Sequence, residues 1–132
     1  MEKQRQVRIE IMDTTLRDGE QTSGVSFLPH EKLLIARMLL DEVKVDRVEV
    51  GSARVSEGEK DAVKMICRAA EEKGNINRVE VLGFVDGGVS LDWIKECGCK
   101  NINLLCKGSL KHCTDQLQKT PEEHIADIKK EL

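Results

Sequence analysis

Apolar residues recur along the chain with two alternating periods. Runs in which every second residue is apolar predict strands, and apolar residues three or four positions apart predict the helices between them. The resulting picture is about four strand–helix units in succession. The expected strands are 7–13, 47–51, 78–84 and 101–106, and the expected helices begin near 29, 56, 90 and 120.

Local signals place the helix ends and the helix faces. Ser56 with Glu59 predicts a capping box, and Thr120-Pro121-Glu122-Glu123 stacks a cap, a first-turn proline and a second box. Gly74 is typical of a helix end. The expected buried faces are Leu34, Ile35, Met38 and Leu39 in the first helix, Ala62, Val63, Ile66 and Ala69 in the second, and Ile125, Ile128 and Leu132 in the last.

Strands that alternate with helices favour parallel pairing, and therefore an α/β fold. An open doubly wound sheet and part of a closed barrel both fit. A whole (β/α)₈ barrel needs about 250 residues, so the 132 residues would supply about the N-terminal half of one. No G-x-G-x-x-G follows the first strand, which disfavours dinucleotide binding, but periodicity does not separate the two sheets further.

Composition narrows the class of protein. Aromatic residues make up 2% of the chain, so the core must be aliphatic, as in parallel strands covered by helices. A net charge of -3 with 34% charged residues gives no large basic field, which argues against a nucleic-acid partner. The absence of a long apolar run argues against a membrane partner. Five cysteines and no secretory leader indicate a reducing, cytoplasmic setting. Cys97-x-Cys99 is closer than the usual zinc spacing, so we expect free, mostly buried thiols.

The segment after the first strand concentrates groups that can do chemistry. Asp13, Arg17, Asp18, Glu20 and Gln21 lie within nine residues, where a parallel barrel places its active site. A carboxylate suits a divalent cation, and an arginine fork suits a substrate carboxylate or an enolate oxygen. Taken alone, the same residues fit a solvated turn equally well.

A resemblance favours the chemical interpretation. The run from Ile11 to Gln21, with Gly24 after it, resembles the first-strand signature of the 2-isopropylmalate, homocitrate and citramalate synthase family, within the HMG-CoA lyase-like TIM-barrel superfamily. Val48-Glu49-Val50-Gly51-Ser52 resembles the family's next motif. The resemblance implies an acyltransferase of amino-acid biosynthesis, such as leucine biosynthesis. In such enzymes acetyl-CoA loses a methyl proton, its enolate attacks the ketone of a 2-oxo acid held by a divalent metal (Mg, Mn or Zn), and the thioester is hydrolysed.

The resemblance also implies roles for individual residues. Arg17 matches a catalytic arginine that stabilises enolate charge and contacts substrate, and Gln21 matches a substrate-binding residue. Asp18 matches a metal ligand, and Glu49 matches an acidic residue that positions the arginine and lies close to the reacting atoms. Glu49 has a second interpretation as part of a polar strand face, because Glu10 and Glu80 repeat its apolar-Glu-apolar pattern; we assign no role to those two.

The family completes its metal site with a later His-x-His pair. The histidines here are His30, His112 and His124, and no two have that spacing. We expect His30 and His124 at the surface, and only His112 near the active face. Residues 1–132 are therefore expected to be the N-terminal portion of a single catalytic barrel domain, truncated, inactive by itself and prone to self-association or instability. The alternatives are a non-catalytic half-barrel that binds or assembles, or an HMG-CoA lyase-like carbon–carbon lyase. The choice among 2-oxoisovalerate, 2-oxoglutarate and pyruvate stays open.

Overall fold

The computed structural model describes residues 7–132, which form a four-stranded parallel sheet with helices between the strands. The strands lie in the order β1-β2-β3-β4, which confirms the predicted succession of strand–helix units. The strands are β1 (Met12–Asp13), β2 (Arg47–Ser52), β3 (Val79–Phe84) and β4 (Ile102–Leu105). The helices are α1 (Pro29–Arg37), α2 (Glu57–Glu72), α3 (Val89–Glu96) and α4 (Pro121–Glu131), and a π-helical segment (Met38–Val43) extends α1.

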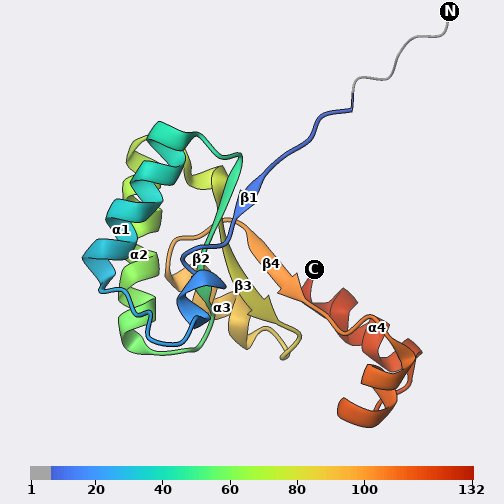
Figure 1. Cartoon of the computed structure of the whole chain (residues 1–132). Coiled ribbons are helices and arrows are strands. Elements are labelled where there is room, and N and C mark those ends of the chain that lie inside the picture. The colour runs from blue at the N-terminus through green and yellow to red at the C-terminus, as the bar shows by residue number, and fades with distance from the viewer. Residues whose placement is uncertain (1–6) are drawn as a thin grey trace, which may run out of the picture.

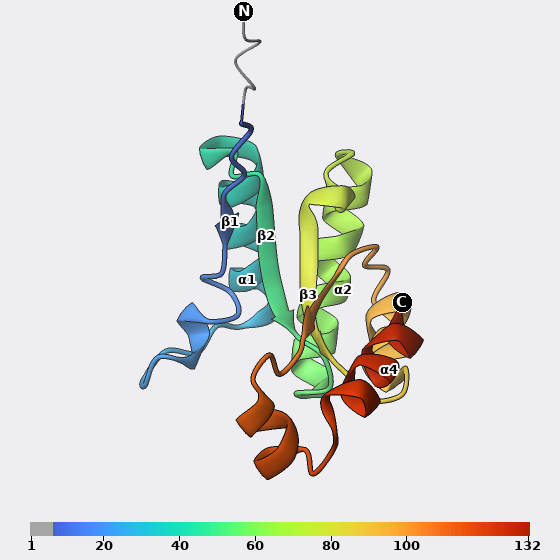
Figure 2. The same ribbon diagram turned by 90° about the vertical axis from the view of Figure 1, so that its right-hand side faces the viewer.

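The helices α1 and α2 pack side by side against one face of the sheet (Figures 1 and 2). A single apolar cluster joins the strands to α1, α2 and α3 through Ala36, Val63 and Ile94. A doubly wound sheet reverses its strand order and carries helices on both faces. The sequential order and the single cluster instead give the arrangement of part of a TIM barrel, and the α/β prediction is confirmed. The strand members of the cluster are Val48, Val50, Val79 and Val81.

The register of the strands fixes a second, polar face. Glu49 is the partner of Glu80 across β2 and β3, and Leu82 is the partner of Asn103 across β3 and β4. Because side chains alternate along a strand, these residues share the face opposite to the apolar cluster. In a barrel this face is the interior. The polar side chains on this face include Arg47, Glu49, Glu80 and Asn103, so candidate functional groups are sought among them first.

The first strand is shorter than predicted. Only Met12 and Asp13 pair with β2, because β2 begins at Arg47, opposite Met12. The side chain of Asp46 accepts the N–H of Ile11 at 2.8 Å, where a strand partner would otherwise stand. Residues 7–10 run past the end of the sheet (Figure 1), and Val7 and Ile9 are 82% and 79% exposed.

The predicted face of α1 is partly wrong. Ile35 and Leu39 pack against the core, but Leu34 and Met38 are more than half exposed. The fully buried stripe is Lys32, Ala36 and Leu40, at four-residue spacing. A lysine in a buried stripe makes that stripe look polar in the sequence. The predicted face of α2 holds for Ala62, Val63 and Ile66, whereas Ala69 is only half-buried.

The last helix begins as predicted and buries other residues than expected. Thr120 and Glu123 form the capping box, with bonds of 3.2 and 2.8 Å. Ile125 is half exposed and Leu132 is almost fully exposed, whereas His124 and Glu131 are buried. The expectation that His124 lies at the surface is therefore wrong: its Nε2 lies 3.1 Å from the carbonyl oxygen of Lys107. Among the described residues, no helix is both long and apolar enough to cross a membrane.

Candidate functional site

The loop after β1 is a tight turn that presents Arg17 over the sheet. The carbonyl oxygen of Thr14 accepts N–H groups from Arg17 and the two residues after it, at 2.8–3.1 Å. Asp13 accepts the backbone N–H of Thr15 at 2.9 Å, so its carboxylate is used as a local cap. Leu16 is fully buried and anchors the turn. Arg17 is thereby fixed immediately after a core residue.

Arg17 and Glu49 are brought together, as their assigned roles require. Arg17 Nε donates to Glu49 Oε1, and Arg17 Nη1 donates to Asp18 Oδ1 at 3.0 Å. Glu49 is fully buried, and its second oxygen accepts from Asn103 Nδ2. Charge-assisted bonds of this kind are stronger than neutral ones, especially away from water. The Glu49 carboxylate therefore holds the guanidinium in a fixed orientation.

The Arg17 guanidinium keeps a free edge. Its side chain is 21% exposed, and Nη2 has no bond to any of residues 7–132. It lines a pocket of about 320 Å³ that also holds Gln21 and Ser52. Gln21 ends a short 3₁₀ turn (Gly19–Gln21) and is exposed. Arg17 and Gln21 therefore line the same pocket, where Nη2 of Arg17 can donate to a ligand.

Asp18, unlike the buried Glu49, presents its carboxylate to solvent. Its carboxylate is 63% exposed and has Arg17 as its partner. Within residues 7–132, no group of three or more histidine, cysteine, aspartate or glutamate side chains is arranged to hold a metal ion. Asp18 offers one hard oxygen ligand, and the other residues present do not complete a metal centre.

The pocket beside Arg17 is lined by none of the three histidines or five cysteines of the chain, all of which fall within residues 7–132. His30 and His112 are exposed. Four cysteines are buried, as predicted, but Cys106 is exposed. Burial raises the pKa of Cys97 to about 11, so this thiol is inert at neutral pH.

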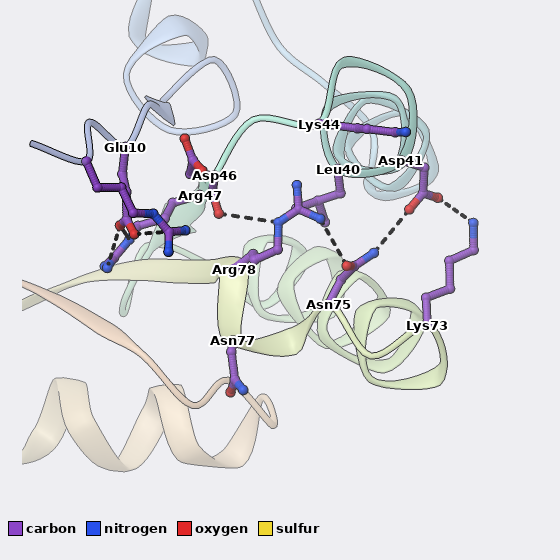
Figure 3. A pocket seen from close by; sticks show the side chains of 11 residues that line it. Glu10, Leu40, Asp41, Lys44, Asp46, Arg47, Lys73, Asn75, Asn77 and Arg78 are labelled. Atoms are coloured by element: carbon purple, nitrogen blue, oxygen red, sulfur yellow. Dashed lines mark hydrogen bonds and ion pairs between the residues drawn. The ribbon is translucent and has the colours of Figure 1, made fainter. Parts of the chain in front are cut away.

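A larger cavity lies at the other end of the strands. It measures about 720 Å³ and is lined by charged residues around the start of β2 and the ends of the first two helices (Figure 3). Several of its charged groups already have partners: Lys73 bonds the Asp41 carboxylate, and Arg78 donates to the backbone carbonyl oxygens of Val45 and Asp46. Catalytic groups in parallel barrels lie at the carboxyl ends of the strands. The smaller pocket beside Arg17 is therefore the better candidate.

Two residues of the site escaped prediction from the sequence. Asn103 alternates with Ile102 and Leu104, and a polar residue between two apolar ones in a strand is a weak signal for the interior face. Lys32 is 1% exposed, and its ammonium bonds Glu20 and Glu59 beneath the loop. The sequence signal for its burial was its position four and eight residues before Ala36 and Leu40, on one face of the helix.

Comparisons with known proteins show which family the chain resembles. A family model described as HMGL-like matches residues 8–132. A Methanopyrus kandleri protein provisionally named (R)-citramalate synthase is 58% identical over 115 residues, which are 87% of this chain and 21% of that protein. The homocitrate synthase of the same organism is 42% identical over 118 residues, 89% of this chain and 28% of that enzyme. The 2-isopropylmalate synthase of Methanocaldococcus jannaschii is 40% identical over 122 residues, 92% of this chain and 22% of that enzyme.

These relatives are much longer than the matched segment. The chain spans between about a fifth and just over a quarter of their lengths. The family model, in contrast, covers nearly all of the present sequence, including the Arg17 turn, Glu49 and Asn103. The resemblance stated from the residues is thereby confirmed, and the chain belongs to the HMGL-like family.

Proposed function

We propose that residues 1–132 are the N-terminal portion of a single catalytic barrel domain, in an acyltransferase that condenses acetyl-CoA with a 2-oxo acid. The observation that carries this proposal is the buried pair of Arg17 and Glu49 at the carboxyl ends of the strands. The relatives named as synthases of citramalate, homocitrate and 2-isopropylmalate support the reaction class. Their shared reaction type points to amino-acid biosynthesis in the cytoplasm.

In this proposal Arg17 stabilises negative charge on the reacting oxygen. When acetyl-CoA loses a methyl proton, charge develops on the thioester oxygen, and a preorganised guanidinium lowers the energy of that state. Nη2 is the nitrogen left for this bond, since Nε and Nη1 are held by Glu49 and Asp18. Glu49 keeps the guanidinium in place, and Gln21 contacts the 2-oxo acid from the same pocket. The enolate then attacks the ketone carbon, the resulting alkoxide takes up a proton in place of the one removed, and water hydrolyses the thioester to a carboxylate and the CoA thiol.

A divalent metal is part of the proposal only through Asp18. This carboxylate would supply one ligand, and a bound cation would supply charge to hold a 2-oxo acid by its oxygens. Residues 7–132 contain no group of three or more histidine, cysteine, aspartate or glutamate side chains that could hold the ion, so Asp18 alone does not make a metal centre. Asp18 has one function that needs no metal, which is to hold Arg17 Nη1.

A chimera tests the proposal. Residues 8–132 would replace the matching segment of the Methanopyrus kandleri relative that is 58% identical. CoA thiol release from acetyl-CoA would be followed with pyruvate, 2-oxoisovalerate and 2-oxoglutarate in turn, with the unaltered relative as control. We expect the chimera to release thiol with whichever acid the relative accepts, and the isolated chain to release none. A folded chimera that is inactive where the relative is active would contradict the proposal.

A half-barrel that assembles without turnover is the second candidate. Val7, Ile9 and Ile11 are 82%, 79% and 64% exposed, and apolar side chains next to a strand edge favour pairing with another copy. Sedimentation of the isolated chain tests the expected homo-oligomer but does not separate the two candidates, because self-association is expected under both. Thiol release by the isolated chain would eliminate the assembly-only function, and a stable monodisperse monomer would contradict the expected homo-oligomer.

A further inference from the structure

A buried lysine lies beneath the loop that carries Arg17, and the proposed chemistry does not use it. Lys32 is 1% exposed, and its position in α1 puts its side chain between α1, the loop after β1, and α2. A buried ammonium is retained only where charge partners and hydrogen bonds replace water. The partners of Lys32 therefore show what it holds.

The Lys32 ammonium bonds groups at both ends of the turn that carries Arg17. Nζ lies 3.3 Å from the carbonyl oxygen of Leu16, the residue immediately before Arg17. It lies 2.5 Å from Glu20 Oε2, one residue before Gln21. The same nitrogen lies 2.6 Å from Glu59 Oε2, on α2. One charge thus ties the start and the end of the turn to a helix of the core.

Each carboxylate also holds a backbone group with its second oxygen. Glu20 Oε1 accepts the N–H of Phe27 at 3.0 Å, and Glu59 Oε1 accepts the N–H of Ser52 at 3.3 Å, at the end of β2. Gly51 makes room for this, because a Cβ there would overlap Glu59 Oε1. The network therefore links the turn to the strand that carries Glu49, the partner of Arg17.

Both carboxylates also line the pocket of about 320 Å³ beside Arg17 and Gln21. Lys32 compensates one of their two negative charges from below. Without it, Glu20 and Glu59 would both face the space in which a 2-oxo acid, itself a carboxylate, would bind. Like charges at close range disfavour each other and any further anion.

We propose that Lys32 is a positioning residue: it fixes the turn from Leu16 to Glu20 against α2 and β2, sets Arg17 against Glu49, and keeps the adjoining pocket open to an anionic substrate. The effect on the anionic substrate rests on the proposed function, whereas the placement of Arg17 does not. Lys32 would not contact the reacting atoms. Its loss would act through the orientation of Arg17 and through the charge of Glu20 and Glu59.

The placement is tested in this chain by nuclear magnetic resonance of the Arg17 Nε–H, which the bond to Glu49 protects from water. We expect Lys32→Met and Glu59→Gln each to speed exchange of that hydrogen by about tenfold or more. Lys60→Met is the matched control, because it removes the same group from an ion pair with Glu96 that lies away from the loop. Unchanged Arg17 exchange in a folded Lys32→Met or Glu59→Gln protein would overturn the proposal. If Lys32→Met does not fold, Glu59→Gln decides, since it keeps the size of the side chain and can still accept the Ser52 N–H.

The effect on the pocket is tested in the chimera. Lys32→Met is expected to raise KM for the 2-oxo acid about tenfold and to lower kcat as well. Adding Glu20→Gln and Glu59→Gln, which removes the two carboxylates, should restore KM but not kcat. For Lys32→Met alone, a KM equal to that of the unmodified chimera would overturn the electrostatic part, and so would a triple variant whose KM stays raised. A chimera with no thiol release at all would sink the proposed function, while the Arg17 exchange rates would still decide the role of Lys32.

Discussion

Glu49 and Glu80 stand side by side in the sheet, in register and in the same apolar-Glu-apolar pattern, yet they have different partners. Glu49 is fully buried and bonds Arg17 and Asn103, one from the loop after β1 and one from β4. Glu80 is nearly as buried and bonds Arg47, which lies on the neighbouring strand. Burial and strand position therefore do not distinguish the two glutamates, whereas the origin of their arginine partners does.

The two arginines differ in their access to water. The Arg17 side chain is 21% exposed, and the Arg47 side chain is 49% exposed. Hydrogen bonds from Arg47 to Glu80, and then to Glu10, raise the pKa of its guanidinium, so the charge of Arg47 is permanent but open to solvent and salt. Arg17 is held in a less screened place and keeps one nitrogen free. Of the two pairs, only Arg17 and Glu49 lie at the carboxyl ends of the strands, where parallel barrels place their catalytic groups.

The largest expected difference is in turnover by the chimera. Arg17→Met should lower the rate of thiol release by about 10²–10³-fold, the usual cost of losing a donor to a developing oxyanion. Arg47→Met should leave the rate within about threefold, because Arg47 lies at the start of β2, away from the carboxyl ends of the strands where the proposed reaction takes place. Thiol-release assays at saturating substrate compare the two variants directly. Equal losses would mean that the two glutamates belong to one functional unit.

The same pair of variants should differ in stability in the isolated chain. Arg17→Met leaves the fully buried Glu49 carboxylate without its charge partner, and removing one member of a buried pair costs about 3–5 kcal/mol. Arg47→Met should lower the free energy of unfolding by a clearly smaller amount, since solvent reaches the Arg47 side chain. Urea titrations of both variants provide the measurement. A larger loss for Arg47→Met would show that shielding is not what separates the pairs.

The sequence predicted the fold and one half of this contrast. Strand alternation and the caps at Ser56 and Thr120 are local signals, so the succession of elements followed from them. The motif from Asp13 to Gln21 placed Arg17, and the second motif placed Glu49. Nothing local in Val79-Glu80-Val81 shows that this glutamate meets Arg47, because that bond depends on strand register.

The failures have the same physical origin. Lys32 makes the buried stripe of α1 look polar, and its two carboxylate partners come from 12 residues upstream and 27 residues downstream, in the loop and in α2. His124 becomes buried because α4 folds back onto the carbonyl group of Lys107. Burial of a charged or polar group can be predicted only when its distant partners are known.

The bond from Asn103 to Glu49 offers a further test of the Glu49 site, with a smaller expected effect on thiol release. Its amide donates to Glu49, whereas Asn101, two residues earlier, donates to the carbonyl oxygen of Val79 at 3.1 Å. Asn103→Ala should lower thiol release by the chimera about tenfold, the scale of one hydrogen bond to a charged group. Asn101→Ala is the control: it should cost stability with little change in the rate. If Asn101→Ala slows the reaction as much, the bond to Glu49 has no special role.

The carboxyl end of β3 supplies the smallest test, because there the strand that carries Glu80 ends in a structural turn. Burial raises the pKa of Asp86, but two hydrogen bonds from Ser90 and the Arg54 guanidinium outweigh it and hold the pKa below its usual value. The N–H groups of this turn also bind Glu131, which fastens α4 to it. The turn is therefore occupied by contacts within the chain.

A lowered pKa means that folding releases the proton of Asp86, so its stabilising contribution is complete above the unfolded pKa of about 4 and disappears as the pH falls through the lower folded pKa. The difference in unfolding free energy between the unaltered chain and Asp86→Asn should shrink between pH 6 and pH 3 in urea titrations. Asp92→Asn, at an exposed position of α3, is the control and should show no such trend. A difference for Asp86→Asn that is constant across this range would mean that the carboxylate charge does not hold the turn, and that the end of β3 is open to a role like that of the loop after β1.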